Sequence, residues 1–338
     1  MRIRTAIADA PVIAGAVSIL VSVVLVEQPP PKPLPSKAGF YVDGGRLYDA
    51  NNKDFVMRGV GHIHTLYPRQ TANALKDIKS LGANTVRIEL STGAVFDKND
   101  TADIMNVISL CKRNRLICVL VAHDTTGWGQ RDGAIPQARA VDYWISVRSA
   151  LAGQEKYVVI NIANEPYVLD NYRTWPADTI NSVKRLRKAG FHHTLMVDAP
   201  DWGQDRSFTM RDNAADVFYN DPDRNTVFSI HMYGAFDRAW KVTNYLSSYV
   251  YAKLPIVITE FGHMHSDGDV DEDTIMSEAK AHGIGYLGWS WSGNGGGVEY
   301  LDMVTDFNAS VLTPWGQRIF NGPGGIRRTS REASVYPA

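Results

Sequence analysis

The chain has 338 residues, of which 44% are hydrophobic and 21% charged, a composition typical of a soluble globular protein. Its 35 basic and 36 acidic residues nearly cancel and leave a net charge of −1. This balance argues against nucleic acid or an anionic membrane surface as a partner. The length allows one large domain or two small ones.

The N-terminal segment differs in composition from the rest of the chain. Arg2 and Arg4 precede an apolar run from Ala10 to Val26, an order that is typical of an export signal. Asp9 interrupts the basic region, and no clear Ala-x-Ala cleavage site follows the run. An uncleaved signal anchor is therefore the alternative, because the run is close to the shortest that spans a membrane.

These features divide the chain into three parts. We expect residues 1–27 to be a signal peptide or a signal anchor, and residues 28–38 to be a Pro-rich linker. Residues 39–338 are expected to form a single folded domain. The protein is expected to be secreted, with an uncleaved membrane anchor as the alternative.

Apolar β-rich runs alternate with helical patterns along this domain. A small β-hairpin is predicted within residues 39–55, where it would close the bottom of the fold. Eight predicted strands follow, at 55–63, 85–90, 117–124, 158–166, 194–200, 227–234, 255–262 and 286–293. Helical patterns such as 71–82 and 271–283 lie between them. The sequence therefore predicts an α/β fold, a (β/α)₈ TIM barrel with a small N-terminal hairpin.

The only two cysteines lie seven residues apart. Cys111 would end a helix and Cys118 would begin the next strand, so we expect a disulfide across the short turn, as an exported protein permits. Two buried thiols are the alternative. The spacing fits no zinc pattern.

Polar or aromatic residues stand near the C-terminal ends of nearly all the predicted strands. They are His62, Arg87, His123, Asn164, Glu165, His231, Tyr233, Glu260 and Trp289. Each one alone has a structural explanation, and Asp198 is expected to be structural. In a barrel of this kind, however, all these strand ends meet at one face, where the chemistry is done. The joint pattern therefore predicts an active site.

Two glutamates at the ends of different strands indicate glycoside hydrolysis. That reaction requires one protonated carboxyl group to assist the leaving oxygen and one ionised carboxylate to attack or to activate water. Arg87 is placed to hold Glu260 ionised by charge pairing. We therefore predict Glu165 as the acid/base and Glu260 as the nucleophile.

Two further groups of side chains are expected around this pair. The predicted supporting residues are Arg87, His123, Asn164, His231 and Tyr233. Among them, Tyr233 would donate to Glu260, and Asn164 would reach the sugar 2-hydroxyl. The predicted sugar contacts are His62, His64, Trp128, Trp202, Trp289 and Trp291. For three of these tryptophans, at positions 128, 202 and 291, packing in the core is an equal alternative.

At these residues the chain resembles glycoside hydrolase family 5. That family carries an Arg, a His, an Asn–Glu pair, a His-x-Tyr, a Glu and a Trp at successive strand ends, and the set is complete here. Within the family, stretches such as ICVLVAHDTTGWG, YVVINIANEP and GYLGWSWSGNGGGVEYLDMV are similar to secreted bacterial endo-β-1,4-mannanases of the actinobacterial and bacillus type. The resemblance covers about residues 39–335.

This resemblance implies a retaining double displacement on internal β-1,4 bonds of mannan, galactomannan and glucomannan, with no cofactor. A β-1,4-glucanase and a mannan transglycosylase on the same scaffold remain alternatives, as does a non-catalytic sugar-binding barrel. Three residues depart from the expected pattern. Gly61 and Asp201 stand where Asn is expected, and Leu66 stands where Trp is expected. These changes concern sugar subsites and leave the catalytic pair intact.

Metal sites are not predicted. Residues 267–278 approximate a calcium loop, but Glu272 stands where the sharp turn needs Gly. The pairs His62-x-His64 and His263-x-His265 have no identified third ligand. The expected partner is a β-mannan polysaccharide, and the protein is expected to be a monomer.

Overall fold

A computed structural model describes residues 37–337 of the chain. The predicted signal segment at 1–27 and most of the linker at 28–38 lie outside the described residues. Among residues 37–337, no helix has the length and hydrophobicity that a membrane span requires.

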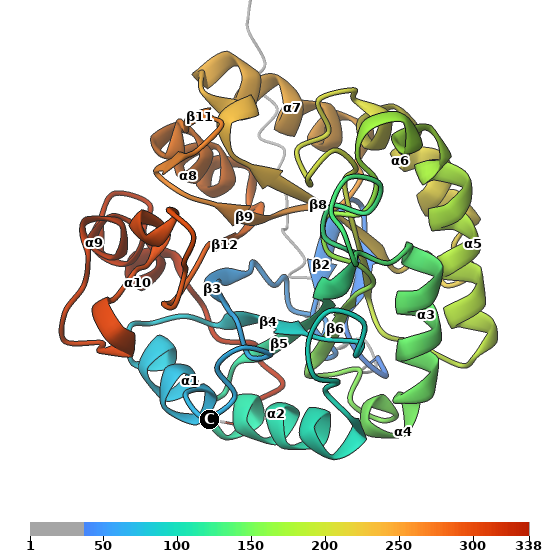
Figure 1. The fold of residues 1–338 in the computed structure, drawn as a ribbon, viewed down its shortest axis with the longest axis horizontal. Helices are drawn as coiled ribbons and strands as arrows, with labels where there is room; N and C mark the ends of the chain where they lie inside the picture. The colour runs from blue at the N-terminus through green and yellow to red at the C-terminus, as the bar shows by residue number, and fades with distance from the viewer. Residues whose placement is uncertain (1–36, 338) are drawn as a thin grey trace, which may run out of the picture. The chain divides into compact units, whose positions relative to one another are not determined.

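Eight parallel strands close into a barrel in the order β12-β3-β4-β5-β6-β7-β8-β9 (Figure 1). The strands are β3 (Arg58–His62), β4 (Thr85–Leu90), β5 (Ile117–Ala122), β6 (Val158–Asn161), β7 (Leu195–Asp198), β8 (Thr226–Met232), β9 (Ile256–Phe261) and β12 (Gly285–Gly288). Each overlaps one of the eight predicted runs, so the predicted barrel is confirmed. Most strands are shorter than predicted. In β5, β6 and β12 the chain leaves the sheet before the polar or aromatic residue that follows the strand, namely His123, Asn164 and Trp289.

Helices surround the barrel and cover its outer face (Figure 1). They are α1 (Thr71–Ser80), α2 (Thr101–Arg113), α3 (Gln137–Ser146), α4 (Arg148–Leu151), α5 (Trp175–Lys188), α6 (Thr209–Asn220), α7 (Ala239–Ala252), α8 (Glu272–His282), α9 (Pro314–Asn321) and α10 (Ile326–Thr329). Short 3-10 turns lie in the loops, namely η1 (His123–Thr125), η2 (Leu169–Thr174), η3 (Gly234–Phe236), η4 (Glu299–Leu301) and η5 (Thr305–Phe307). Two small hairpins complete the fold, β1 (Tyr41–Asp43) with β2 (Arg46–Tyr48) and β10 (Met264–His265) with β11 (Gly268–Asp269).

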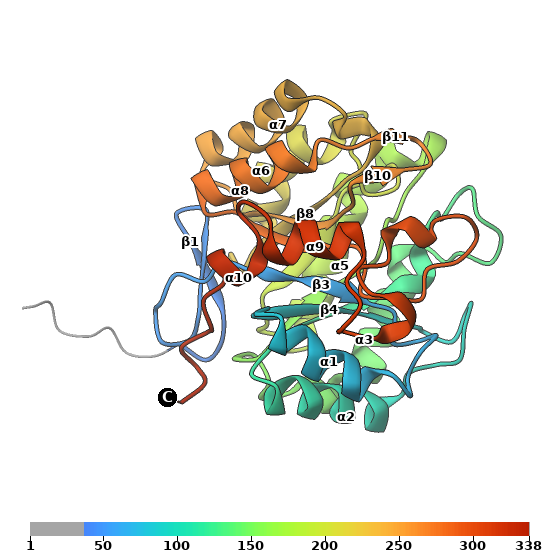
Figure 2. The same ribbon diagram turned by 90° about the vertical axis from the view of Figure 1, so that its left-hand side faces the viewer.

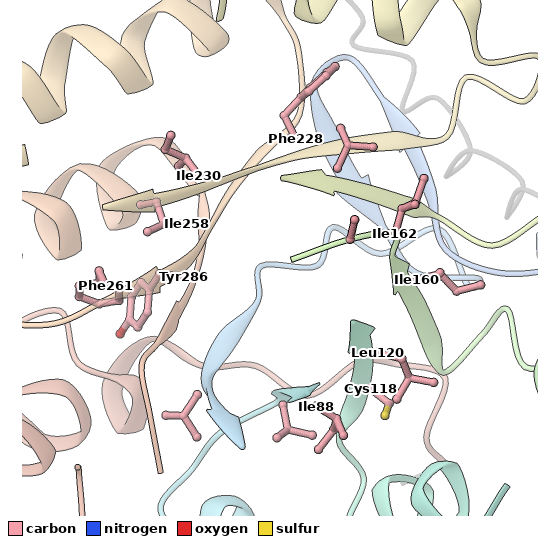
Figure 3. Packing of buried hydrophobic residues seen from close by; sticks show 14 of the residues in the cluster. Ile88, Cys118, Leu120, Ile160, Ile162, Phe228, Ile230, Ile258, Phe261 and Tyr286 are labelled. Atoms are coloured by element: carbon pink, nitrogen blue, oxygen red, sulfur yellow. The ribbon is translucent and has the colours of Figure 1, made fainter. Parts of the chain in front are cut away.

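The strand sequences are apolar on both faces because both faces are buried. Alternate residues such as Ile88, Leu120 and Ile160 point outward and pack against the helices (Figure 3). The intervening residues point into the barrel. Val119 and Val159 are examples from its lower part.

The bottom of the barrel, at the N-terminal ends of the strands, is closed by both ends of the domain (Figure 2). Phe40, Leu47 and Phe55, from the β1–β2 hairpin and its flanks, join the inward-facing apolar residues in one buried cluster. Near the C-terminus Tyr336 joins the same cluster, and its hydroxyl donates to the backbone oxygen of Leu116 at 2.7 Å. The predicted hairpin plug is therefore confirmed.

The predicted disulfide is wrong in this structure, where Cys111 and Cys118 are free and buried. Both side chains belong to the apolar layer between α2 and the outer face of β5, where they pack as small hydrophobic groups. Burial, followed by interaction with Cys111, raises the pKa of the Cys118 thiol well above its usual range. Disulfide formation needs a reachable thiolate, which this buried layer does not favour.

Candidate active site

A cavity of about 480 Å³ opens at the C-terminal ends of the barrel strands. We call it the catalytic cleft. It is lined by His123, Asn164, Glu165, Trp202, Gln204, Arg206, Tyr233, Glu260, His265, Asp267, Trp289, Val298 and Leu301. Both predicted catalytic glutamates therefore face the same cavity.

Glu165 is presented by a strained turn that follows β6. Its φ of +41° lies in the left-handed region, which costs a non-glycine residue on the order of 1–3 kcal/mol. Hydrogen bonds fix this turn from both sides. The Thr125 hydroxyl donates to the Asn164 backbone oxygen at 2.6 Å, and the Glu165 backbone N–H donates to Asp198 Oδ2 at 3.2 Å. The surrounding structure thus holds the carboxyl group of Glu165 at the wall of the cleft.

Glu260 points into the barrel because of an irregularity in β9. Along β8, the partner of Ile230 is Ile258, but the partner of His231 is Glu260, so Thr259 is an extra residue in β9. Strict alternation from Ile258, which packs in the outer layer, would place Glu260 on that outer face as well. The bulge shifts the alternation by one residue and turns Glu260 toward the cleft, a known use of β-bulges beside active sites.

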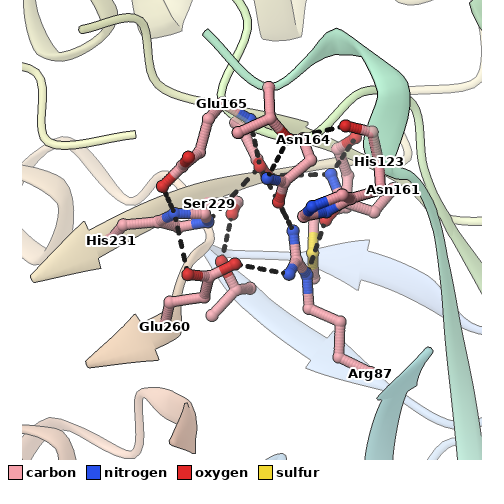
Figure 4. A network of polar contacts seen from close by, with 12 residues as sticks. Arg87, His123, Asn161, Asn164, Glu165, Ser229, His231 and Glu260 are labelled. Atoms are coloured by element: carbon pink, nitrogen blue, oxygen red, sulfur yellow. Dashed lines mark hydrogen bonds and ion pairs between the residues drawn. The ribbon is translucent and has the colours of Figure 1, made fainter. Parts of the chain in front are cut away.

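The two carboxyl groups lie close together, on either side of the His231 ring. One oxygen of Glu165, one oxygen of Glu260 and a ring nitrogen of His231 all lie within 4.8 Å of one another. His231 Nδ1 is 2.8 Å from Glu165 Oε1 and 3.5 Å from Glu260 Oε2, so its ring stands between the carboxylates (Figure 4). Retaining enzymes place their carboxyl groups about 5–5.5 Å apart, whereas inverting enzymes leave roughly 6.5–9.5 Å for a water.

A buried guanidinium connects this pair to the floor of the cleft (Figure 4). Arg87 is fully buried and donates to Glu89 Oε1 (2.5 Å), Glu260 Oε1 (2.8 Å), Asn161 Oδ1 (3.0 Å), Asn164 Oδ1 (2.5 Å) and Asp198 Oδ2 (3.3 Å). Burying this charge is tolerable only because the acceptors surround it. The result is a fixed positive charge against one oxygen of Glu260.

The protonation states of the site follow from burial and from these neighbours. Burial alone would lower the pKa of His231, but the charges of Glu260 and Asp198 and the hydrogen bonds to Asp198 and Glu165 raise it to about 10. Burial raises the pKa of Glu260 to about 7, against the opposing charges of His231 and Arg87.

The hydrogen bonds that Glu260 accepts oppose the effect of burial on its pKa. Arg87 donates to one of its oxygens and the Tyr233 hydroxyl donates to the other at 2.8 Å. Two donors, one of them charged, favour the carboxylate form. We take the anion as the reactive form of Glu260, because a protonated oxygen beside Arg87 would find no hydrogen-bond acceptor on the guanidinium.

Glu165, His231 and Glu260 also have the spacing of a metal site. A protonated imidazole offers no lone pair, however, and the pKa of His231 is raised to about 10 by its acidic neighbours after burial has lowered it. The donor set therefore suits proton transfer better than metal ligation.

Comparisons with known proteins agree with this geometry. The sequence model described as cellulase (glycosyl hydrolase family 5) matches residues 48–295. The chain belongs to glycosyl hydrolase family 5. A mannan endo-1,4-beta-mannosidase of Streptomyces lividans is 55% identical over 299 residues, which are 88% of this chain and 78% of that protein.

Two other similar proteins are a longer relative with a double name and a relative of solved structure. A longer beta-mannanase/endoglucanase A of Caldicellulosiruptor saccharolyticus is 49% identical over 260 residues, 77% of this chain but 20% of that protein. The beta-mannanase of Thermomonospora fusca, solved as a mannotriose complex, is 56% identical and superposes with a TM-score of 0.85. That match covers 88% of this chain and 99% of the solved chain.

Several predicted residues of this family 5 chain lie where they were expected. Tyr233 donates to Glu260, and His123, whose Nδ1 is 2.8 Å from Glu89 Oε2, lines the cleft. Trp202 and Trp289 also line the cleft. Each therefore has the position that its predicted role requires.

Asn164 reaches the cleft but is already engaged. Its Oδ1 accepts from Arg87, and its Nδ2 donates to the Thr126 hydroxyl at 2.8 Å. One amide proton of Asn164 remains for a sugar hydroxyl.

The predicted sugar contacts of His62 and His64 are wrong. Both rings are buried outside the cleft, 2.9 and 2.6 Å from the Thr71 hydroxyl, and His64 also contacts Asp103 at 2.9 Å. Burial, with a smaller contribution from His64, lowers the pKa of His62 to about 3. These histidines fasten the end of β3 to α1 and α2, because their ring nitrogens meet Thr71 and Asp103.

The predicted sugar contact of Trp291 is also wrong. Trp291 is fully buried in the outer apolar layer, where it packs edge-on against Phe320 with ring centroids 6.3 Å apart. Trp128 is partly buried and packs edge-on against Tyr167 at 5.3 Å. Its contact with sugar stays a prediction, whereas for Trp291 the alternative of packing is the observed one.

Sequence reasoning missed Glu89 and Asn161, and it treated Asp198 as structural only. All three are buried acceptors for Arg87. Period-two alternation could have found Glu89, because it lies two residues after Arg87 on the same strand face. The departure at Gly61 is linked to the position of Trp289, since a β-carbon on Gly61 would lie 2.9 Å from the Trp289 ring.

Proposed function

We propose that this chain is an endo-acting β-1,4-mannanase that hydrolyses internal bonds of mannan, galactomannan and glucomannan with retention of configuration. The observation that carries the mechanism is the pair of carboxyl groups within 4.8 Å of each other in an open cleft. The substrate class is supported by the names of the Streptomyces relative and of the Thermomonospora protein, which binds mannotriose.

In the first step, Glu260 attacks the anomeric carbon while the carboxyl group of Glu165 gives its proton to the departing glycosidic oxygen. The carbon–oxygen bond to the leaving sugar breaks, and an ester bond to Glu260 forms. Arg87 and Tyr233 hold the attacking carboxylate in one orientation through its two oxygens. This orientation lowers the entropy cost of reaching the transition state.

In the second step, Glu165 acts as the base. Because Glu260 is now part of the ester, Glu165 is the carboxylate left beside the anomeric carbon to accept a proton. Glu165 takes a proton from water, the water oxygen attacks the anomeric carbon, and the bond to Glu260 breaks. Two displacements at the same carbon restore the original configuration.

A β-1,4-glucanase is the second candidate, favoured by the double name of the Caldicellulosiruptor relative. The two substrates differ in the orientation of one hydroxyl group, which a few contacts discriminate. Because such polymers do not cross cell membranes, we also propose that the chain acts outside the cell, as residues 1–27 predict.

The test is reducing-sugar release from galactomannan and from carboxymethyl cellulose, measured in parallel. We expect release from galactomannan by the wild type and none by Glu260→Ala. Glu299→Ala removes an exposed carboxylate outside the cleft lining and should retain activity. Cleavage of cellulose without cleavage of mannan would select the glucanase, and no cleavage by folded wild type would overturn both.

A further inference from the structure

A second cavity of about 510 Å³ adjoins the catalytic cleft. The two cavities share three lining residues, Gln204, Arg206 and Asp267. Beyond this shared wall, the second cavity extends between the start of α6 and the first two turns of α7. Neither the catalytic steps nor the barrel core accounts for it.

The shared wall is a fixed feature of the loops. Asp267 Oδ1 accepts from the Gly234 backbone N–H at 3.1 Å and lies 2.6 Å from His265 Nδ1. Its Oδ2 accepts from Gln204 at 2.9 Å and from Arg206 at 2.5 Å. One carboxylate therefore joins the loops that follow β7, β8 and β9, and these loops form the rim between the two cavities.

Aromatic side chains line the second cavity without being buried by the fold. The side chain of Trp240 is 63% exposed and that of Phe208 is 43% exposed. The Arg211 guanidinium covers a face of the Phe208 ring, 3.8 Å from its centroid. Near Trp240, the closest cation is the ammonium of Lys241, 5.9 Å from the ring centroid. The indole of Trp240 is thus the more open platform.

The cationic side chains at this cavity are already paired. Arg206 contacts Asp267, Lys241 contacts Asp237 at 2.6 Å, and Arg211 contacts Asp212 at 2.8 Å. An anionic ligand would have to break these pairs. An uncharged polyhydroxyl ligand would not, and it could use the exposed amide of Asn244 for a hydrogen bond.

We propose that the second cavity binds a hexosyl unit of the same polysaccharide that occupies the catalytic cleft. The sugar ring stacks on Trp240, its hydroxyl groups bond to Asn244 and Arg206, and the polymer passes over the rim at Arg206. This inference rests on the proposed function. The hexosyl unit is either a further main-chain residue or a side branch, and the two have the same chemistry.

The test compares a long and a short substrate in Trp240→Ala. We expect kcat/KM on galactomannan to fall about two- to tenfold, the size of an aromatic contact, and kcat/KM on an aryl β-mannobioside to stay unchanged. The matched control is Tyr251→Ala, at the other end of α7, whose side chain is 93% exposed and does not line the cavity. It should change neither value.

Two oligosaccharides distinguish the sources of the hexosyl unit. If only a galactosyl-branched oligomer loses kcat/KM in Trp240→Ala, the unit is a branch, and if unbranched mannohexaose loses it equally, the unit belongs to the main chain. Equal kcat/KM values for Trp240→Ala and Tyr251→Ala on every substrate would overturn the second sugar site and leave the proposed function standing. A wild-type protein that cleaves no mannan would instead remove the proposed function.

Discussion

The two ends of the barrel are built from the same strands but from opposite kinds of residue. At the bottom, the inward-facing side chains are apolar, namely Ile117, Val119, Val159, Met196, Val227, Val257 and Leu287. At the top, the inward-facing side chains are charged or polar, namely Arg87, Glu89, Asn161, Asp198, His231 and Glu260. Burial of apolar surface at the bottom stabilises the fold, whereas removing charges from water at the top destabilises it in part.

Within strand β7 the inward-facing side chains change from apolar to charged between one inward position and the next. Met196 and Asp198 are two residues apart and point into the same interior. Met196 belongs to the apolar cluster, while Asp198 accepts from Asn161 at 2.8 Å and contacts Arg87. Substitutions at the two ends should therefore separate activity from stability.

The largest expected effect is at the top. Glu165→Ala removes the proposed acid/base and should lower kcat on mannan by about 10²- to 10⁴-fold, the usual contribution of proton transfer by a side chain. On an aryl β-mannobioside with a good leaving group, the first step needs no proton, and added azide can replace water without a base. The loss on that substrate with azide should thus be much smaller. An equal loss on both substrates would contradict the role of Glu165.

At the bottom, Met196→Ala should lower stability and leave the chemistry intact. Deleting this buried side chain creates a cavity in the apolar cluster, and we expect the free energy of unfolding to fall by about 2–5 kcal/mol. Urea denaturation measures this change. At a temperature where the variant is folded, its kcat should equal that of the wild type, and a large drop in kcat would break the separation between the two ends.

A smaller effect is expected from Tyr233→Phe, which removes one donor to Glu260. Loss of this hydrogen bond destabilises the carboxylate, so the pKa of Glu260, already raised to about 7 by burial, should rise further. Because only the ionised nucleophile reacts, kcat/KM falls as the pH drops through this pKa. The acidic limb of the pH profile should therefore move to higher pH.

The measurement is kcat/KM for an aryl β-mannobioside as a function of pH. Tyr67→Phe is the matched control, since the Tyr67 hydroxyl donates to the Gly293 backbone oxygen and does not contact either glutamate. An acidic limb that stays in place or moves to lower pH in Tyr233→Phe would show that Tyr233 does not tune Glu260.

Much of this architecture follows from the sequence because it depends on local patterns. Apolar runs alternating with helical patterns predicted the barrel, and polar residues at the strand ends predicted which face would carry the site. The roles of Arg87 and Tyr233 as partners of Glu260 also follow, because the C-terminal ends of all strands meet at one face.

Other features depend on tertiary contacts that the sequence pattern does not contain. His62 stands at a strand end like the catalytic residues, but the chain then turns its ring toward Thr71. The bulge at Thr259, which turns Glu260 inward, leaves no signal in a run that is apolar on both faces. The spacing of Cys111 and Cys118 allowed a disulfide but could not reveal that both thiols lie in an apolar layer.

The most direct test of the central claim is to trap the glycosyl-enzyme with an activated 2-deoxy-2-fluoro-β-mannobioside and to locate the label by peptide mass spectrometry. Fluorine at C2 slows both displacements, and the activated leaving group restores the first, so the ester should accumulate. Our account predicts a covalent label on Glu260. A label on Glu165, or no label together with an inverted first product, would contradict it.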